Sequence, residues 1–348
     1  MSGNWTPFSA RFWPGPDEKS RFDQSAPMHM TAKSPALASH EEPWPCRTSF
    51  TWVMVGTYGS AALLAWCMYK YVSGHTAFLW LIVPLMLVSS HFMHAMLIAY
   101  HEAAHGNLRQ WKWLNEFDGQ LVGMISLTPF TLYRALHQKH HVNLATVKDL
   151  ELWPFVDPQQ PLWWRRAAAF LELNFGFFYT PYLFWRVFLE NPSPVTNKTV
   201  RKRIWIETAG MILLWTTALA LVAWFNVWNW FLVLYFIPAF IAGNMQSWRK
   251  YIEHVGLSGN SARSATRSII VETTPGRFVA LSLLHQPLHG VHHAKSSIPC
   301  DELVEHVALI EPKDDGDTAP FPNYRSAFAD LIKRLHDPRV GAQWATAE

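Results

Sequence analysis

Residues 77–105 read AFLWLIVPLMLVSSHFMHAMLIAYHEAAH, an apolar run that ends in two histidines four residues apart. A helix needs about 20 apolar residues to cross the hydrocarbon core of a bilayer, and the part at 77–100 meets that length. Stretches at 51–70, 205–226 and 229–247 meet it as well. Lipid offers no partner for open backbone groups, so these spans are expected to be helices. The sequence therefore predicts an all-α integral membrane protein with four transmembrane helices in two hairpins.

Composition agrees with a chain that keeps much of its surface in lipid. Half of the 348 residues are hydrophobic, 16% are charged and 19 are tryptophan. The net charge of +3 is too small to indicate a nucleic-acid partner. Cys46, Cys67 and Cys300 share no CxxC spacing, so neither a disulfide framework nor a cysteine metal site is indicated.

Lysine and arginine counts predict the orientation. Residues 101–204 carry twelve of the 29, whereas the short turns of the two hairpins carry one between them, Lys70. By the positive-inside rule, the termini and the middle segment face the cytosol, as in a bacterial inner membrane or its equivalent. We expect a polar cytosolic tail at 1–48 without a signal peptide, a membrane domain at 49–310 and a C-terminal cytosolic tail at 311–348.

Two further apolar stretches are not expected to span. The stretch at 170–190 is aromatic but contains Glu172, Arg186 and Glu190, and each charge near the bilayer centre costs about 2.5–3.5 kcal/mol. It is predicted to lie on the membrane surface as an amphipathic segment. The run at 119–130 is too short to cross, so we expect it to be interfacial or re-entrant.

Eight of the 17 histidines form three short clusters, and each cluster has helical spacing. Residues three or four apart share one face of a helix, so HxxxH and HxxHH each aim their imidazoles at one point. With four spans, all three clusters emerge on the cytosolic side, where they would form a helical cap around a metal site. Eight imidazoles exceed a four-coordinate zinc site and suit two metal ions, which could be iron, copper or zinc. The clusters are HEAAH (His101, His105), HQKHH (His137, His140, His141) and HGVHH (His289, His292, His293).

The order HxxxH, HxxHH and a second HxxHH resembles the membrane fatty acid desaturase and hydroxylase superfamily over about residues 50–305. The flanking sequences HQKHHVNLATVKDLELWP and HQPLHGVHHAKSSIPCDEL are also similar to that family. Asp149 stands at a usual acidic position, whereas His285 stands where many relatives have asparagine. Relatives contribute a further histidine after the fourth span, and WRKYIEHVG supplies His254.

This resemblance implies a di-iron centre held by the eight cluster histidines and His254, with O2 as co-substrate. It implies oxidation of an unactivated C–H bond in an acyl chain, with desaturation as the expected outcome. The substrate would be an acyl thioester, an acyl lipid or a free fatty acid. The chain has no HPGG haem motif and no cysteine cluster, so a separate ferredoxin, rubredoxin or cytochrome b5 type donor is implied.

Five other polar residues are candidates for supporting roles. His285, Glu102 and Asp149 are expected beside the metals, either as ligands or as partners that orient an imidazole. His91 and His94 lie inside the second span, where polar side chains usually face the bundle interior. They line the approach to the metals, brace the residues around the ligands, or only hydrogen-bond between helices.

The sequence is also compatible with other reactions at the same centre and with one other class of enzyme. Hydroxylation, carotenoid-type oxidation and oxidative decarboxylation of a fatty acid to a 1-alkene all occur among proteins with similar clusters. A different class is an intramembrane zinc protease using the HExxH pattern of His101, Glu102 and His105. A zinc protease would not use the other two histidine clusters.

Overall fold

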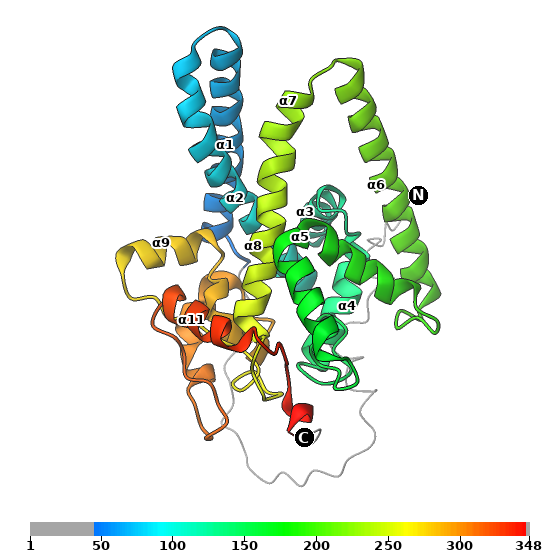
Figure 1. Ribbon diagram of the computed structural model, residues 1–348, viewed down its shortest axis with the longest axis vertical. Helices are drawn as coiled ribbons and strands as arrows, with labels where there is room; N and C mark the ends of the chain where they lie inside the picture. Colours follow the sequence, from blue (N-terminus) through cyan, green and yellow to red (C-terminus); the bar gives the residue numbers. More distant parts are fainter. Residues whose placement is uncertain (1–44, 346–348) are drawn as a thin grey trace, which may run out of the picture.

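The computed structural model describes residues 45–345, so almost all of the tail predicted at 1–48 lies outside the described residues. Figure 1 shows a helical molecule in which long helices extend from a more compact helical base. Among the described residues no strand forms apart from one isolated bridge between Ile269 and Phe321. The all-α prediction is therefore confirmed.

Four helical stretches are long and apolar enough to cross a membrane, as the sequence predicted. Large apolar side chains stay exposed along them, including Trp80 and Trp224 at 84% each. Such exposure would be unfavourable in water and is expected in lipid. The stretches are α1 (Thr48–Val72), η3 with α2 (Thr76–Phe78 and Leu79–His105), α6 (Lys198–Trp224), and α7, η4 and α8 (Trp228–Phe231, Leu232–Phe236 and Ile237–His254).

The two consecutive pairs of long helices pack differently. α1 and α2 lie side by side, whereas α6 and α8 diverge from the turn that joins them (Figure 1). α8 packs instead against α2 and α5 (Leu162–Leu189). Close approach of α5 and α8 requires glycines, because a Cβ on Gly243 would lie 2.7 Å from the Phe177 Cα. The space beside α8 is therefore filled by α5 and not by α6.

Three helices follow α2, and none of them is among the four stretches that are long and apolar enough to cross a membrane. α3 (Lys112–Ile125) and α4 (Phe130–Val142) cover the shorter apolar run. α5 contains the stretch predicted to lie on the membrane surface, and its backbone leaves helical geometry at Phe175. The position of α5 relative to the bilayer stays a prediction.

Buried polar contacts hold α4 against α6. Glu207 of α6 accepts hydrogen bonds from the Thr131 backbone N–H at 2.8 Å and from the Thr131 hydroxyl at 2.6 Å. The same carboxylate accepts from Arg203 Nε at 3.0 Å. Because a helix N-terminus has unpaired N–H groups, this carboxylate stabilises the start of α4. The helix that carries HQKHH thus has a fixed position relative to the long helices.

The C-terminal part folds against the helices that carry the histidines. Its elements are α9 (Thr274–Ser282), η5 (Gln286–Leu288), α10 (His289–Ala294), η6 (Cys300–Ile310), α11 (Tyr324–Arg334) and η7 (Ala342–Trp344). α11 packs on α8, and the Val340 N–H donates to the Phe155 carbonyl at 2.9 Å. Residues after 310, expected as a tail, therefore include a helix that packs on the rest of the fold.

A disulfide joins Cys46 to Cys300, 254 residues further along the chain. The expectation of no disulfide is wrong, because sequence spacing carries no sign of a pair brought together only by folding. Next to it, Asp301 accepts hydrogen bonds from the backbone N–H groups of Thr48 at 2.8 Å and Ser49 at 3.2 Å. These contacts attach the start of α1 to the segment that follows HGVHH.

Candidate metal centre

All nine histidines named as ligands come together in two adjoining groups. Donor atoms of the five-histidine group lie within 4.8 Å of one another, and the same holds for three members of the four-histidine group. His289 completes the four-histidine group, because its Nε2 lies 2.9 Å from the His254 Nε2. The five-histidine group comprises His101, His105, His137, His141 and His292; the four-histidine group comprises His140, His254, His289 and His293.

Most of the nine histidines lie in the last turns of helices, and His289 is an exception as the first residue of α10. His105 and His254 are the last residues of α2 and α8. The HQKHH histidines lie in the last turns of α4, and HGVHH forms most of α10. The C-terminal end of a helix carries partial negative charge, which favours a cation.

The spacing of the imidazole nitrogens fits shared metal ions. In the five-histidine group, His137 Nε2 lies 3.1 Å from the Nε2 atoms of both His105 and His141, and His141 Nε2 lies 3.3 Å from His292 Nε2. Imidazole nitrogens bind a metal at about 2.1 Å, so neighbouring ligands of one ion lie about 3.0–3.4 Å apart. The Nε2 atoms are therefore spaced as the ligands of one ion would be.

Several of these nitrogens have no hydrogen-bond partner. Both ring nitrogens of His101 and of His293 are buried without one among residues 45–345. Buried polar groups without partners are rare and call for an explanation such as an ion. The donor set fits a pair of transition-metal ions.

Burial keeps the α10 histidines in the form that binds metal. It lowers the pKa values of His289, His292 and His293 well below 6.5, and the neighbouring histidines lower them further. These imidazoles are neutral at pH 7, as metal ligation requires.

Carboxylates orient two of the α4 histidines from the side opposite the shared Nε2 atoms. The Nδ1 of His140 lies 2.8 Å from Asp149, which is completely buried, and the Nδ1 of His137 lies 2.9 Å from Glu151. Burial alone lowers the pKa of His140, but Asp149 outweighs it and raises that pKa above 6.5. Holding Nδ1 in this way fixes the ring and leaves Nε2 for a metal.

Two further groups lie behind Nδ1 atoms of the four-histidine group. Glu253 Oε1 lies 3.4 Å from His289 Nδ1, and the Ala265 carbonyl lies 2.9 Å from His254 Nδ1. The sequence analysis did not assign Glu151 or Glu253 any role. Neither has a periodic signal, although both lie within two residues of residues that it did name, Asp149 and His254.

Glu102 is fully buried between the two chain segments that carry HEAAH and HGVHH. Its Oε1 accepts a hydrogen bond from Gln286 Nε2 at 2.6 Å and lies 3.8 Å from His101 Nδ1 and 3.7 Å from His292 Nδ1. It is not part of the cavity lining described below. The carboxylate therefore lies beside both imidazoles, beyond hydrogen-bond distance of either one.

His285, His91 and His94 lie outside both groups. His285 has a left-handed backbone, with φ 53°, a conformation that asparagine and histidine tolerate better than most residues. Histidine can therefore occupy this position without the strain that a β-branched residue would have. His91 Nε2 lies 2.8 Å from the Ser282 hydroxyl of α9, and His94 is buried. Neither belongs to the cavity lining among the described residues.

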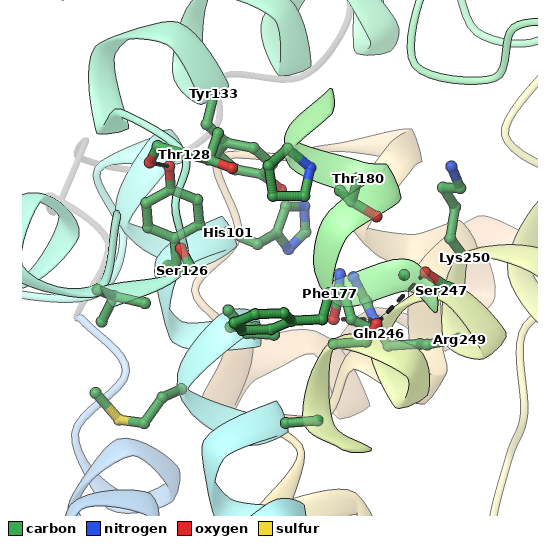
Figure 2. A pocket seen from close by; sticks show the side chains of 18 of the residues that line it. His101, Ser126, Thr128, Tyr133, Phe177, Thr180, Gln246, Ser247, Arg249 and Lys250 are labelled. Atoms are coloured by element: carbon green, nitrogen blue, oxygen red, sulfur yellow. Dashed lines mark hydrogen bonds between the residues drawn. The ribbon is translucent and has the colours of Figure 1, made fainter. Parts of the chain in front are cut away.

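An apolar cavity of about 250 Å³ reaches the histidines from between the long helices. Figure 2 shows part of its lining, with His101 from α2, Tyr133 from α4, Phe177 from α5 and Gln246 from α8. Five histidines of the two groups line it: His101, His137, His140, His254 and His289. A chain-like apolar molecule in this cavity would lie directly beside the two groups.

Comparisons with known proteins agree with this arrangement. A family model described as fatty acid desaturase matches residues 78–336. The chain is similar to an acyl-lipid (9+3)-(E)-desaturase of Dimorphotheca sinuata, with 21% identity over 61% of this chain and 62% of the relative. It is also similar to an sn-1 acyl-lipid omega-3 desaturase (ferredoxin) of Synechocystis sp., with 25% identity over 33% of this chain and 31% of the relative. The chain thus aligns with less than two thirds of the length of either relative.

Proposed function

This chain belongs to the fatty acid desaturase family, and on that premise we propose that it forms a C=C bond in a fatty acyl chain, using O2 at a di-iron centre. The observation that carries the proposal is the convergence of nine histidines beside an apolar cavity. Overall, –CH2–CH2– and O2, with two electrons and two protons, give –CH=CH– and two water molecules.

The two histidine groups would hold the two iron ions. Bound iron supplies the redox chemistry, because an unactivated C–H bond has neither an acidic proton nor a leaving group. The protein's part is to hold and orient the ligands. Asp149 and Glu151 fix the rings of His140 and His137 through Nδ1, while Glu102 lies between His101 and His292.

The cavity would position the acyl chain and exclude water. Its walls near the histidines include Tyr133 and Phe184, and further along α2 they include Met93 and Leu97. Apolar walls favour a methylene chain, and a fixed path places one carbon pair beside the metals. Reaction position is then a matter of where the chain stops.

The relatives' names and the lysine and arginine distribution support a proposal for the substrate class and the electron donor. Both curated relatives are named acyl-lipid desaturases, and one name includes ferredoxin. We propose an acyl lipid, acyl thioester or free fatty acid as substrate and a separate ferredoxin, rubredoxin or cytochrome b5 type donor. The lysine and arginine distribution supports a cytosolic position for the metal centre.

The zinc-protease reading has little support. His101 and His105 adjoin three further histidines, and Glu102 is fully buried beside Gln286. A general base for water must reach the reacting water. Hydroxylation, carotenoid-type oxidation and decarboxylation remain alternative outcomes at the same centre, and product analysis distinguishes them.

The test is expression in a host of defined lipid composition, with products profiled by mass spectrometry after feeding a labelled fatty acid. We expect wild type to give a new unsaturated product and His140→Ala to give none. His336→Ala is the matched control, because the exposed His336 side chain hydrogen-bonds only to the Lys333 carbonyl among the described residues, and the backbone carbonyl that accepts from Arg166 is kept. If the product is an alcohol or a 1-alkene, the reaction is hydroxylation or oxidative decarboxylation and not desaturation. Unchanged product from His140→Ala would contradict the metal site.

A further inference from the structure

The disulfide between Cys46 and Cys300 lies where three parts of the chain meet. The Cys46 N–H donates to the Asn107 carbonyl at 3.1 Å, and Asn107 follows HEAAH by two residues. The Asn107 side chain donates to the Ser296 carbonyl at 2.8 Å, and Ser296 follows HGVHH by three residues. The cross-link therefore joins the start of α1 to both segments that carry HEAAH and HGVHH.

The same cysteine pair adjoins the carboxylate of Glu102. The Cys46 Sγ lies 3.7 Å from Glu102 Oε2, and Cys46, Glu102 and Cys300 are all buried. The other oxygen of this carboxylate, Oε1, lies 3.8 Å from His101 Nδ1 and 3.7 Å from His292 Nδ1. A chemical change at the two sulfur atoms therefore acts on a carboxylate beside two members of the five-histidine group.

A disulfide in this place is unusual for the cytosolic position that the lysine and arginine distribution supports. Thiols in the cytosol are kept reduced, and cytosolic disulfides are usually transient, with catalytic or redox-sensing roles. Cys46 and Cys300 are 1% and 0% exposed, but Arg47 and Thr48, next to Cys46, are exposed. The pair thus lies directly below the surface, so a small local opening would let an attacking thiolate reach it.

We propose that Cys46 and Cys300 form a reversible thiol–disulfide switch, whose linked form holds iron in the five-histidine group more tightly than its reduced form does. The exchange partner is a small cytosolic thiol of the glutathione class. Two glutathione thiols reduce the protein disulfide to two cysteine thiols, and glutathione disulfide is the other product. The reverse exchange forms the cross-link again. The switch goes beyond the proposed function and depends on it only for the metal.

Reduction has two local consequences for the ligands. The segments after HEAAH and HGVHH keep their hydrogen bonds but lose the covalent link between Cys46 and Cys300. The Cys46 thiol also becomes a weak donor within reach of Glu102 Oε2, while Gln286 donates to Oε1 of the same carboxylate. Altering the groups behind ligating histidines changes metal affinity by about 10–100-fold. The cysteines act through Glu102, so we expect an effect at the lower end of that range.

The first measurement counts free thiols in the purified full-length protein after equilibration with mixtures of reduced and oxidised glutathione. The chain has three cysteines, so a maleimide applied after denaturation adds one label to the linked form and three labels to the reduced form. Cys67, which packs between α1 and α2, supplies the constant label. We expect the count to change reversibly between one and three as the glutathione ratio changes.

The second measurement is retention of iron during titration with a chelator, after the glutathione has been removed. Reduction of wild type should lower the chelator concentration at the midpoint about tenfold. Cys46→Ser and Cys300→Ser should each show the midpoint of the reduced form, whichever glutathione mixture was used. Cys67→Ala is the matched control and should respond to glutathione as wild type does. The comparison of the two wild-type forms needs no variant to fold.

Three results would overturn the switch. The first is a thiol count that never changes, which would make the pair permanently linked or permanently reduced. The second is an equal chelator midpoint for linked and reduced wild type. The third is a response to glutathione that persists in Cys46→Ser, because glutathione would then act on the iron and not on the cysteines.

Failure of the proposed function gives a different pattern. Wild type would then hold no iron in either form, which removes the claim about iron affinity, while the thiol count would separately show whether the pair is reversible. Failure of the switch alone leaves iron bound with the same midpoint in both forms.

Discussion

Replacing Glu151 tests whether carboxylates behind the histidines tune metal binding. Glu151 Oε2 lies 2.9 Å from His137 Nδ1, and the two side chains are 13% and 4% exposed. Glu151→Gln keeps a hydrogen-bond acceptor but removes the charge, whereas Glu151→Ala removes both. Loss of a partner behind a ligating histidine costs about 10–100-fold in metal affinity or activity.

The burial of this pair sets where each variant falls in that range. Little solvent screens the contact, so we expect about a tenfold loss of iron affinity for Glu151→Gln and about a hundredfold loss for Glu151→Ala. These factors correspond to about 1.4 and 2.7 kcal/mol. The side chain makes no hydrogen bond to backbone among the described residues, so the fold should survive both changes.

The assay is retention of iron during titration with a chelator, followed by metal analysis of the protein. Glu172→Gln is the matched control, because Glu172 lines the same cavity and pairs with Lys250 but contacts no histidine. Its chelator midpoint should equal that of wild type. If Glu151→Gln and Glu151→Ala both retain iron like the control, the carboxylate has no role in holding metal.

Three further predictions concern packing, substrate length and pH. Gly243→Ala should destabilise the protein by about 1–3 kcal/mol, because its Cβ meets the α5 backbone at 2.7 Å, whereas Gly210→Ala has ordinary contacts and should be nearly neutral. Ala239 lines the cavity about 22 Å along α8 from His254. Ala239→Phe would fill that part of the cavity, so the products should shift toward shorter acyl chains. Burial alone would raise the pKa of Asp330, but hydrogen bonds, chiefly from Arg267, hold it below 3.8. Its stabilising effect is fully present above that pH and is lost as pH falls through the lower folded-state pKa. The difference in melting temperature between Asp330→Asn and wild type should therefore be largest above about pH 3.8 and should shrink as the pH falls further.

A specific result would contradict each of these three predictions. Equal melting temperatures for the two glycine variants would show that α5 and α8 can separate without cost. An unchanged product length distribution for Ala239→Phe would remove this part of the cavity from the substrate path. If the difference in melting temperature between wild type and Asp330→Asn grew as the pH fell, the sign of the pKa argument would be wrong.

The sequence predicted the spans and the convergence of the histidines because both depend on short-range patterns. An apolar run of the right length predicts a helix wherever it packs. Spacing in HxxxH and HxxHH determines which imidazoles share a helix face, and the count of spans then brings the clusters to one side. His254 needed more than spacing, since it came from the resemblance to the family.

Features that depend on contacts between distant segments were not predictable in the same way. Nothing local to Cys46 indicates that Cys300 lies next to it. The role of Glu151 depends on the turn that returns the chain to His137. The divergence of α6 from α8 depends on α5 occupying the space beside α8, which the short connection between them does not reveal.

The most direct test of the central claim is metal analysis of the purified protein, with iron and zinc counted per chain. The nine-histidine centre predicts about two iron ions per chain, with iron lost from His140→Ala and from His292→Ala and retained in His336→Ala. One zinc ion and no iron per chain, unchanged by His140→Ala, would contradict the di-iron assignment and favour a site built on HEAAH alone.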